Sequence, residues 1–278
     1  MNFKYIFLLS VLHVTACTHN SKQLHEGPEG YDLSQPEKFV MPNVLHEISG
    51  IAFSNTNNDT IYAEQDEEGK LFHFKPGSKD IATTKFGKKG DFEDVSISNN
   101  TVVMLRSDGR LFSFPLSESI NEEAANVQEW KDILPEGEYE GMCVIDSNLY
   151  VLCKHCSDAS ETKGYIFKIT AGNIIAAGNF AIDVASIEAL SGEQKIKFHP
   201  SALAKHPLTG EWYIVSSVNK LLVITDSMWK VKKVFPLDAS LFNQPEGIAF
   251  DKQGNLFISN EGGDAGEGTI LKFLYTKK

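Results

Sequence analysis

One short pattern occurs five times along the chain and limits the folds open to it more than any other feature. Each copy is a run of the kind Glu-Gly-Ile-Ala-Phe followed by two further apolar runs, with polar turns between them. Short runs rich in Ile, Val, Phe and Tyr and bounded by turn residues predict β-strands. The copies begin at Ser49, Glu93, Glu140, Ser201 and Glu246. A three- or four-stranded unit repeated about every 40–50 residues is typical of a β-propeller.

A propeller blade has four strands, so each copy needs one more. Candidates follow the first four copies, at residues 81–86, 127–130, 174–178 and 231–235. The fifth copy has no such candidate after it, but Lys38–Met41 ahead of the first copy has strand character. Pairing that segment with the fifth copy would close the ring and cover an exposed sheet edge. We therefore predict an all-β fold, a five-bladed β-propeller whose last blade is closed by an N-terminal strand.

The spacing of the copies leaves one alternative open. It is wider between Glu140 and Ser201 than elsewhere, so a sixth, degenerate blade could lie between residues 170 and 200. We also expect a short helical or irregular excursion over residues 182–190.

The N-terminus predicts export. Lys4 precedes an apolar run, Ile6–Leu12, that is too short to span a bilayer. The run ends in Val-Thr-Ala-Cys, which resembles a bacterial lipobox and implies that residues 1–16 are a lipoprotein signal peptide and that Cys17 is lipidated. An ordinary secretory signal is the alternative. We expect membrane attachment through Cys17 in the bacterial cell envelope, and Thr18 in place of Asp favours the outer membrane.

Two further features concern organisation and partners. Residues 17–37 are polar and contain Pro and Gly, so they predict a flexible tether ahead of a propeller over 38–278. The net charge of −11 repels phosphate backbones and argues against a nucleic-acid partner.

The first residue of each copy is the strongest candidate for a site. The first strand of a blade lines the central channel, so Ser49, Glu93, Glu140, Ser201 and Glu246 should meet around the axis. Carboxylates that converge must take up a proton or a cation, and their hard oxygens suit Ca²⁺. We predict a calcium site formed by Glu93, Glu140 and Glu246. The alternative is that these glutamates accept hydrogen bonds from backbone amides of neighbouring blades.

Other polar residues should lie around the same end of the axis. Residues two positions before the motif, and residues where the second strands end, are also polar. The first group is Glu47, Asp91, Glu138, His199 and Gln244; the second is Glu64, Asp66, Arg106, Lys154 and Glu261. We predict a polar rim around this axial mouth, suited to a small polar ligand or a protein partner. Its members are Ser49, Asp94, Ser201, Glu64, His199 and Glu261.

The remaining cysteines favour a structural role over a redox role. Cys153 and Cys156 form a CxxC pair, but it follows a β-strand, whereas a redox CxxC begins a helix. A structural disulfide is expected in an exported protein, and its pairing among these two and Cys143 stays open. The sequence contains no GxSxG elbow, phosphate-binding Gly-rich loop or HExxH motif.

Several of the copies resemble a known family. The matching segments are Ile48-Ser49-Gly50-Ile51, Phe92-Glu93-Asp94-Val95, Tyr139-Glu140-Gly141-Met142, the run from Gln244 to Phe250 and the run from Asn255 to Glu261. Together they resemble the SdiA-regulated family, which is distantly similar to NHL-repeat propellers, over roughly residues 40–275. The resemblance implies a five-bladed propeller in an exported or membrane-attached bacterial protein, with a calcium site carried over onto Glu93, Glu140 and Glu246. The chain departs from the pattern at Ala202, where Gly is more usual.

Three functions compete. We favour a lipid-anchored, calcium-binding propeller that binds a ligand or partner and is not an enzyme. The alternative is a calcium-dependent hydrolase of the lactonase or phosphoesterase type, in which the axial metal acts as a Lewis acid and Asp94, Glu138 or His199 as base. The third is a structural domain that recognises its partner along a blade edge.

Overall fold

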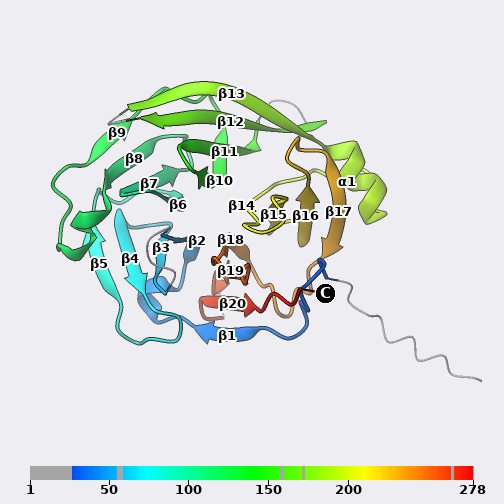
Figure 1. Ribbon diagram of the computed structural model, residues 1–278, viewed down its shortest axis with the longest axis horizontal. Coiled ribbons are helices and arrows are strands. Elements are labelled where there is room, and N and C mark those ends of the chain that lie inside the picture. The colour runs from blue at the N-terminus through cyan, green and yellow to red at the C-terminus, as the bar shows by residue number, and fades with distance from the viewer. Residues whose placement is uncertain (1–26, 55–58, 157–159, 171–172, 264–265, 278) are drawn as a thin grey trace, which may run out of the picture.

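The structure is a computed structural model that describes residues 27–277, apart from 55–58, 157–159, 171–172 and 264–265. Five four-stranded antiparallel sheets stand in a ring around a central axis (Figure 1). In the first four blades the strands follow one another from the axis outward in chain order. The structure confirms the predicted five-bladed β-propeller.

The strand bounds follow the repeats. Blade 1 contains β2 (Ile48–Phe53), β3 (Ile61–Gln65), β4 (Lys70–Phe74) and β5 (Ala82–Lys85), and blade 2 contains β6 (Phe92–Ser98), β7 (Thr101–Arg106), β8 (Leu111–Pro115) and β9 (Gln128–Trp130). Blade 3 contains β10 (Glu138–Ile145), β11 (Asn148–His155), β12 (Glu161–Thr170) and β13 (Asn173–Asp183). Blade 4 contains β14 (Ala202–Lys205), β15 (Trp212–Ser216), β16 (Leu221–Thr225) and β17 (Val231–Pro236), and blade 5 contains β18 (Pro245–Phe250), β19 (Leu256–Asn260), β20 (Thr269–Phe273) and β1 (Glu37–Val40).

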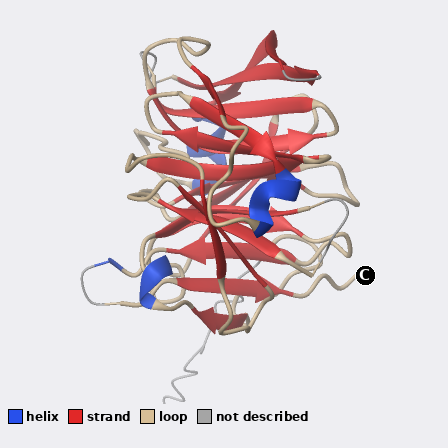
Figure 2. Ribbon diagram, turned by 90° about the vertical axis from the view of Figure 1, so that its left-hand side faces the viewer, coloured by secondary structure: helices blue, strands red, loops and turns tan. Residues whose placement is uncertain are grey.

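The apolar core lies between the blades. The second strands β3, β15 and β19 are buried along their whole length, because each sheet is covered on both faces by its neighbours (Figure 2). This explains why each of these strands begins with a continuous apolar run and does not alternate apolar with exposed polar residues. The core therefore consists of five clusters of packed side chains arranged around the ring.

The last blade closes as predicted. Strand β1 pairs antiparallel with β20, so that Glu37 lies opposite Lys272 and Val40 opposite Thr269. The sixth blade considered for residues 170–200 is wrong. Those residues form the long β12–β13 hairpin and the helix α1 (Val184–Ser191), which lies on the outside of the ring. The Asp183 side chain accepts hydrogen bonds from the backbone N–H groups of Ala185 and Ser186, as a good N-cap does.

The described part of the predicted tether does not stand apart from the domain. Residues 1–26, with the predicted signal peptide and Cys17, lie outside the described residues. Beyond them, Tyr31 and Leu33 are buried in the cluster between blades 4 and 5. The Tyr31 hydroxyl donates to the Gly254 carbonyl and lies 2.7 Å from His206 Nε2. Aromatic burial and these hydrogen bonds offset the entropy of ordering the segment, which the polar composition alone does not reveal.

The pairing of the cysteines is settled by the fold. Cys153 and Cys156 form a disulfide, and Cys143 is free. The described residues include no helix with the length and apolar character needed to cross a membrane.

Candidate functional site

The first motif residues of the blades meet at one end of the axis. The innermost strands β2, β6, β10, β14 and β18 contact one another in sequence around the ring. The Ser49 hydroxyl donates to the Glu93 carbonyl over 3.1 Å, and the Ser259 hydroxyl donates to the Ser49 carbonyl over 2.5 Å. The Ser201 hydroxyl accepts from Ser217 N–H at 3.4 Å. The predicted convergence of this column is therefore present.

The three glutamates of the column occupy β-bulges. In blade 2 the register shifts between Phe92 and Asp94, in blade 3 between Tyr139 and Gly141, and in blade 5 between Pro245 and Gly247. The residue skipped in each case is Glu93, Glu140 or Glu246. A bulge bends the strand and redirects one side chain out of the normal alternation. The same local feature therefore places one carboxylate from each of three blades at the axial mouth, and the sequence pattern did not reveal the bulges themselves.

Burial and the charges of neighbouring carboxylates keep Glu93 and Glu140 from ionising easily. Burial, followed by the charges of Glu140, Asp91 and Glu64, raises the pKa of Glu93 to about 10. Burial also raises the pKa of Glu140 to about 7, with Glu246 adding to the rise and Lys154 opposing it. Carboxylates close to one another in a low-dielectric site favour proton or cation uptake.

Lys154 supplies a cation of the protein's own. Its ammonium group pairs with Glu140 Oε1 and lies 3.6 Å from Glu138 Oε1. Burial lowers the pKa of Lys154, but Glu140, Glu138 and Glu246 outweigh it, so the net pKa is raised. Lys154 was predicted to lie at this mouth, but its pairing with a proposed metal ligand was not.

A second layer of carboxylates surrounds the column. Burial and then the charges of Glu246, Asp66 and Glu47 raise the pKa of Glu261 to about 7. Burial, Glu47 and Asp91 raise the pKa of Asp66 to about 6. Each of these carboxylates raises the pKa of its neighbours, because like charges repel. The mouth is therefore a dense cluster of carboxyl groups.

Two residues predicted for the rim, Glu64 and Asp94, are buried and accept hydrogen bonds from backbone amides. Glu64 is fully buried, and its Oε1 accepts a hydrogen bond from Gly50 N–H at 2.6 Å. Asp94 is buried and accepts from Val95 N–H at 2.8 Å and from Met142 N–H at 2.6 Å, so it links blade 2 to blade 3. Their carboxylates satisfy backbone amides of the inner strands. Hydrogen bonds of this kind to a neighbouring blade were the alternative considered for the glutamates of the column; Asp94 makes one, and Glu64 makes its hydrogen bond within its own blade.

Two histidines complete one side of the mouth. His199, predicted for the rim, has its ring 4.3 Å from that of His155, and His155 Nδ1 lies 2.7 Å from Glu138 Oε2. Burial, followed by His155, lowers the pKa of His199.

The donor chemistry of the mouth fits a hard cation. Within the described residues, Glu64 Oε2, Asp66 Oδ1 and Glu140 Oε2 are buried oxygens without a hydrogen-bond partner. Carboxylate oxygens are the ligands that Ca²⁺ takes up in proteins. No group of three or more His, Cys, Asp or Glu side chains in the described ranges is arranged to hold a metal ion as the side chains stand. The calcium site at Glu93, Glu140 and Glu246 stays a prediction.

Solved structures with a similar fold are remote in sequence. A luciferin-regenerating enzyme shares 9% identity at a TM-score of 0.54, covering 86% of this chain and 95% of that one. A glutaminyl cyclase of Myxococcus xanthus shares 14% at 0.54, covering 86% and 97%. The calcium-binding protein regucalcin of Agrobacterium tumefaciens shares 12% at 0.52, covering 90% and 96%. At such identities the likeness establishes the fold alone.

Sequence comparison points to one family. No curated protein matches the chain. The model of the SdiA-regulated family matches residues 166–263, which include the Pro-Glu-Gly-Ile segment of blade 5. The resemblance to the SdiA-regulated family is thus confirmed over residues 166–263 of a five-bladed β-propeller.

Proposed function

We propose that the protein is an exported, lipid-anchored β-propeller that binds calcium at its acidic axial mouth and presents a ligand- or partner-binding surface there. The observation that carries this proposal is the position of Glu93, Glu140 and Glu246 at three equivalent bulges around the axis, where Glu140 Oε2 is a buried oxygen without a hydrogen-bond partner. Unpaired buried carboxylates are costly, so a cation that enters the mouth gains favourable electrostatic energy. Attachment to the envelope through Cys17 is part of the same proposal.

The residues assigned to calcium are the three bulge glutamates. Glu93, Glu140 and Glu246 would each offer oxygens, and waters would complete the six to eight positions that the ion takes. Lys154 competes with the ion for Glu140, because its ammonium group already pairs with that carboxylate. Binding should therefore respond in opposite directions to loss of a ligand and to loss of the lysine.

The likeness to regucalcin agrees with this proposal but does not carry it. That protein is described as calcium-binding and has a similar fold, at a TM-score of 0.52. The argument for calcium here rests on the carboxylates of this chain.

Calorimetry should detect Ca²⁺ binding by the metal-free chain, together with a rise in melting temperature. Glu246→Gln leaves the Lys154–Glu140 pair in place, and we expect it to weaken binding at least about tenfold, because one anionic ligand is lost. Lys154→Met removes the competing cation and should strengthen binding.

Glu122→Gln changes an exposed carboxylate in blade 2 and is the matched control, with affinity unchanged. Absence of binding, or equal binding in Glu246→Gln and the wild type, would contradict the proposed site.

A calcium-dependent hydrolase of lactones or phosphoesters is the second candidate, favoured by the Glu138–His155 contact beside the mouth. A carboxylate can orient an imidazole as general base, while a bound metal ion polarises the substrate. If this candidate is correct, turnover of lactones or phosphodiesters should disappear with EDTA and fall about 100-fold in His155→Ala. No turnover of either class, or turnover that resists EDTA, would remove this candidate.

A further inference from the structure

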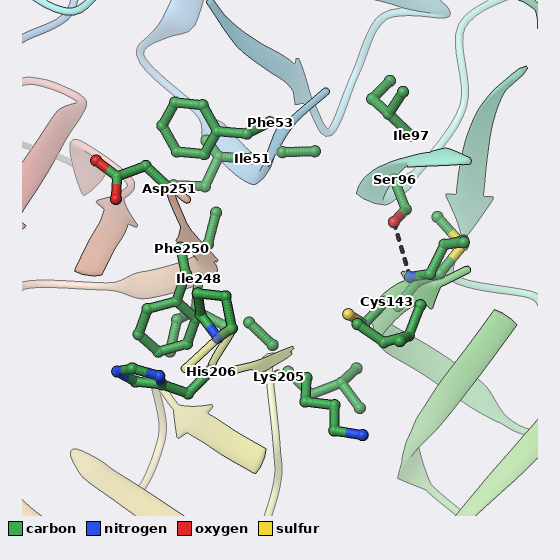
Figure 3. A pocket seen from close by; sticks show the side chains of 18 of the residues that line it. Ile51, Phe53, Ser96, Ile97, Cys143, Lys205, His206, Ile248, Phe250 and Asp251 are labelled. Atoms are coloured by element: carbon green, nitrogen blue, oxygen red, sulfur yellow. Dashed lines mark hydrogen bonds between the residues drawn. The ribbon is translucent and has the colours of Figure 1, made fainter. Parts of the chain in front are cut away.

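A cavity of about 460 Å³ surrounds the axis at the end opposite the acidic mouth (Figure 3). It is lined by residues further along the same innermost strands, and all five blades contribute to it. Small-molecule sites in proteins are mostly clefts of roughly 300–1,000 Å³ with apolar walls and a few polar groups. The cavity falls within that range.

The repeat itself produces the cavity. Two positions after the first motif residue, every copy has a large apolar side chain, and all five are buried: Ile51, Val95, Met142, Leu203 and Ile248. The following position is small in every copy: Ala52, Ser96, Cys143, Ala204 and Ala249. Small side chains on all five blades leave space around the axis, and the large ones supply apolar surface to its wall.

Most polar groups of the wall are already engaged. Ser96 Oγ accepts from Val144 N–H at 2.9 Å, and the Asp251 carboxylate accepts from the backbone of its own turn, at Gln253 and Asn255. His206 Nδ1 accepts from Leu208 and Thr209 N–H groups, which leaves the proton on Nε2 beside the Tyr31 hydroxyl. Burial lowers the pKa of His206, which favours the neutral ring.

Lys205 differs from these engaged groups in lacking a carboxylate partner among the described residues. It lies at the rim of the cavity, with its ammonium group 5.5 Å from the centre of the Trp212 ring. Within the described residues no carboxylate lies at ion-pair distance from this ammonium group. Asp146 is the carboxylate exposed at the opening. A cavity whose wall combines apolar side chains with polar groups, and which has a cation at its rim, matches a molecule that has an apolar body and one anionic end.

We propose that this axial cavity binds a small amphipathic anion, an apolar chain or ring that carries one carboxylate, with the apolar part inside the ring and the carboxylate at Lys205. The two ends of the axis then select opposite charges, because the acidic mouth repels such a molecule. The cavity is separate from the proposed calcium site and shares none of its residues.

Titration calorimetry of the full chain with decanoate, and with 1-decanol as the neutral analogue, tests the proposal. We expect decanoate to bind with one molecule per chain, and Lys205→Met to weaken it at least about tenfold while leaving 1-decanol unchanged, because a charge-assisted contact is lost. Lys163→Met, a half-buried lysine on β12, is the matched control and should behave as the wild type.

A variant that fills the cavity tests whether the ligand lies inside the ring. Cys143 projects its sulfur into the cavity (Figure 3), so Cys143→Phe should abolish binding of both probes, while Cys143→Ser should retain it. If Cys143→Phe does not fold, Ala52→Leu blocks the cavity from blade 1. The proposal is overturned if decanoate does not bind, if a folded blocking variant binds it normally, or if Lys205→Met has no effect.

Discussion

Replacing Gly50 with alanine should lower the free energy of unfolding by about 3 kcal/mol, as overpacking of a tight interior does. A Cβ at this position would lie 2.5 Å from Asp94 Cα and 2.8 Å from Val95 N. These are backbone atoms of the neighbouring blade, and they cannot move without disturbing the hydrogen bonds that Asp94 makes to Val95 and Met142. Denaturant unfolding measured at equilibrium checks the prediction.

Gly141→Ala is the matched control, because Gly141 occupies the same position of the repeat in blade 3. There the nearest atoms to an added Cβ are Leu203 Cδ2 at 3.0 Å and Ala202 Cα at 3.2 Å. The leucine methyl can shift, so we expect a cost below about 1 kcal/mol. Equal effects of the two substitutions would show that close approach of the blade backbones does not set the requirement for glycine.

Raising the pH from about 5 to about 9 in metal-free buffer should destabilise the protein by about 2–4 kcal/mol, allowing for solvent screening. The folded pKa is about 10 for Glu93 and about 7 for Glu140 and Glu261, against an ordinary value of 4.5. Between those values the folded state binds more protons than the unfolded state, so stability falls as the pH rises. For each of these carboxyl groups, the contribution to stability is fully present below the pKa of the unfolded state. It is lost as the pH rises through the pKa of the folded state.

Chemical denaturation in EDTA across this range measures the slope. Glu93→Gln removes the carboxyl group whose pKa is raised to about 10 and should flatten the profile, whereas Glu122→Gln should not alter it. Lys154 is the cation facing these carboxylates, and it moderates the effect at Glu140 without reversing it. A wild-type stability that stays flat or rises over the interval would show that the mouth is more solvated than its burial indicates.

The periodic features of this chain are predictable because they depend on local pattern. The repeats determine the strands, the ring and the convergence of Ser49, Glu93, Glu140, Ser201 and Glu246. The pairing of Lys38–Met41 with the fifth copy follows from the need to cover a sheet edge.

Other features depend on distances between blades, which local pattern does not contain. Asp94 faces the amide of Met142 because blades 2 and 3 approach closely there. Lys154 reaches Glu140 from the adjacent strand of the same blade, where the bulge at Glu140 sets which side chains meet. Tyr31 is fixed by His206, 175 residues away, so its polar surroundings in sequence pointed to a tether. The axial cavity was also missed, although its signal was present as small residues recurring three positions after each motif start.

The pairing of β1 with β20 also determines the order of events during synthesis. Strand β1 is synthesised early but cannot pair until β20 has been made, because β1 ends at Val40 and β20 begins at Thr269. The four other blades are each built from consecutive strands and can form as they emerge, whereas joining distant segments is slow. A nascent chain that lacks β20 therefore has an open ring. The axial mouth and the cavity are completed together only when blade 5 has formed.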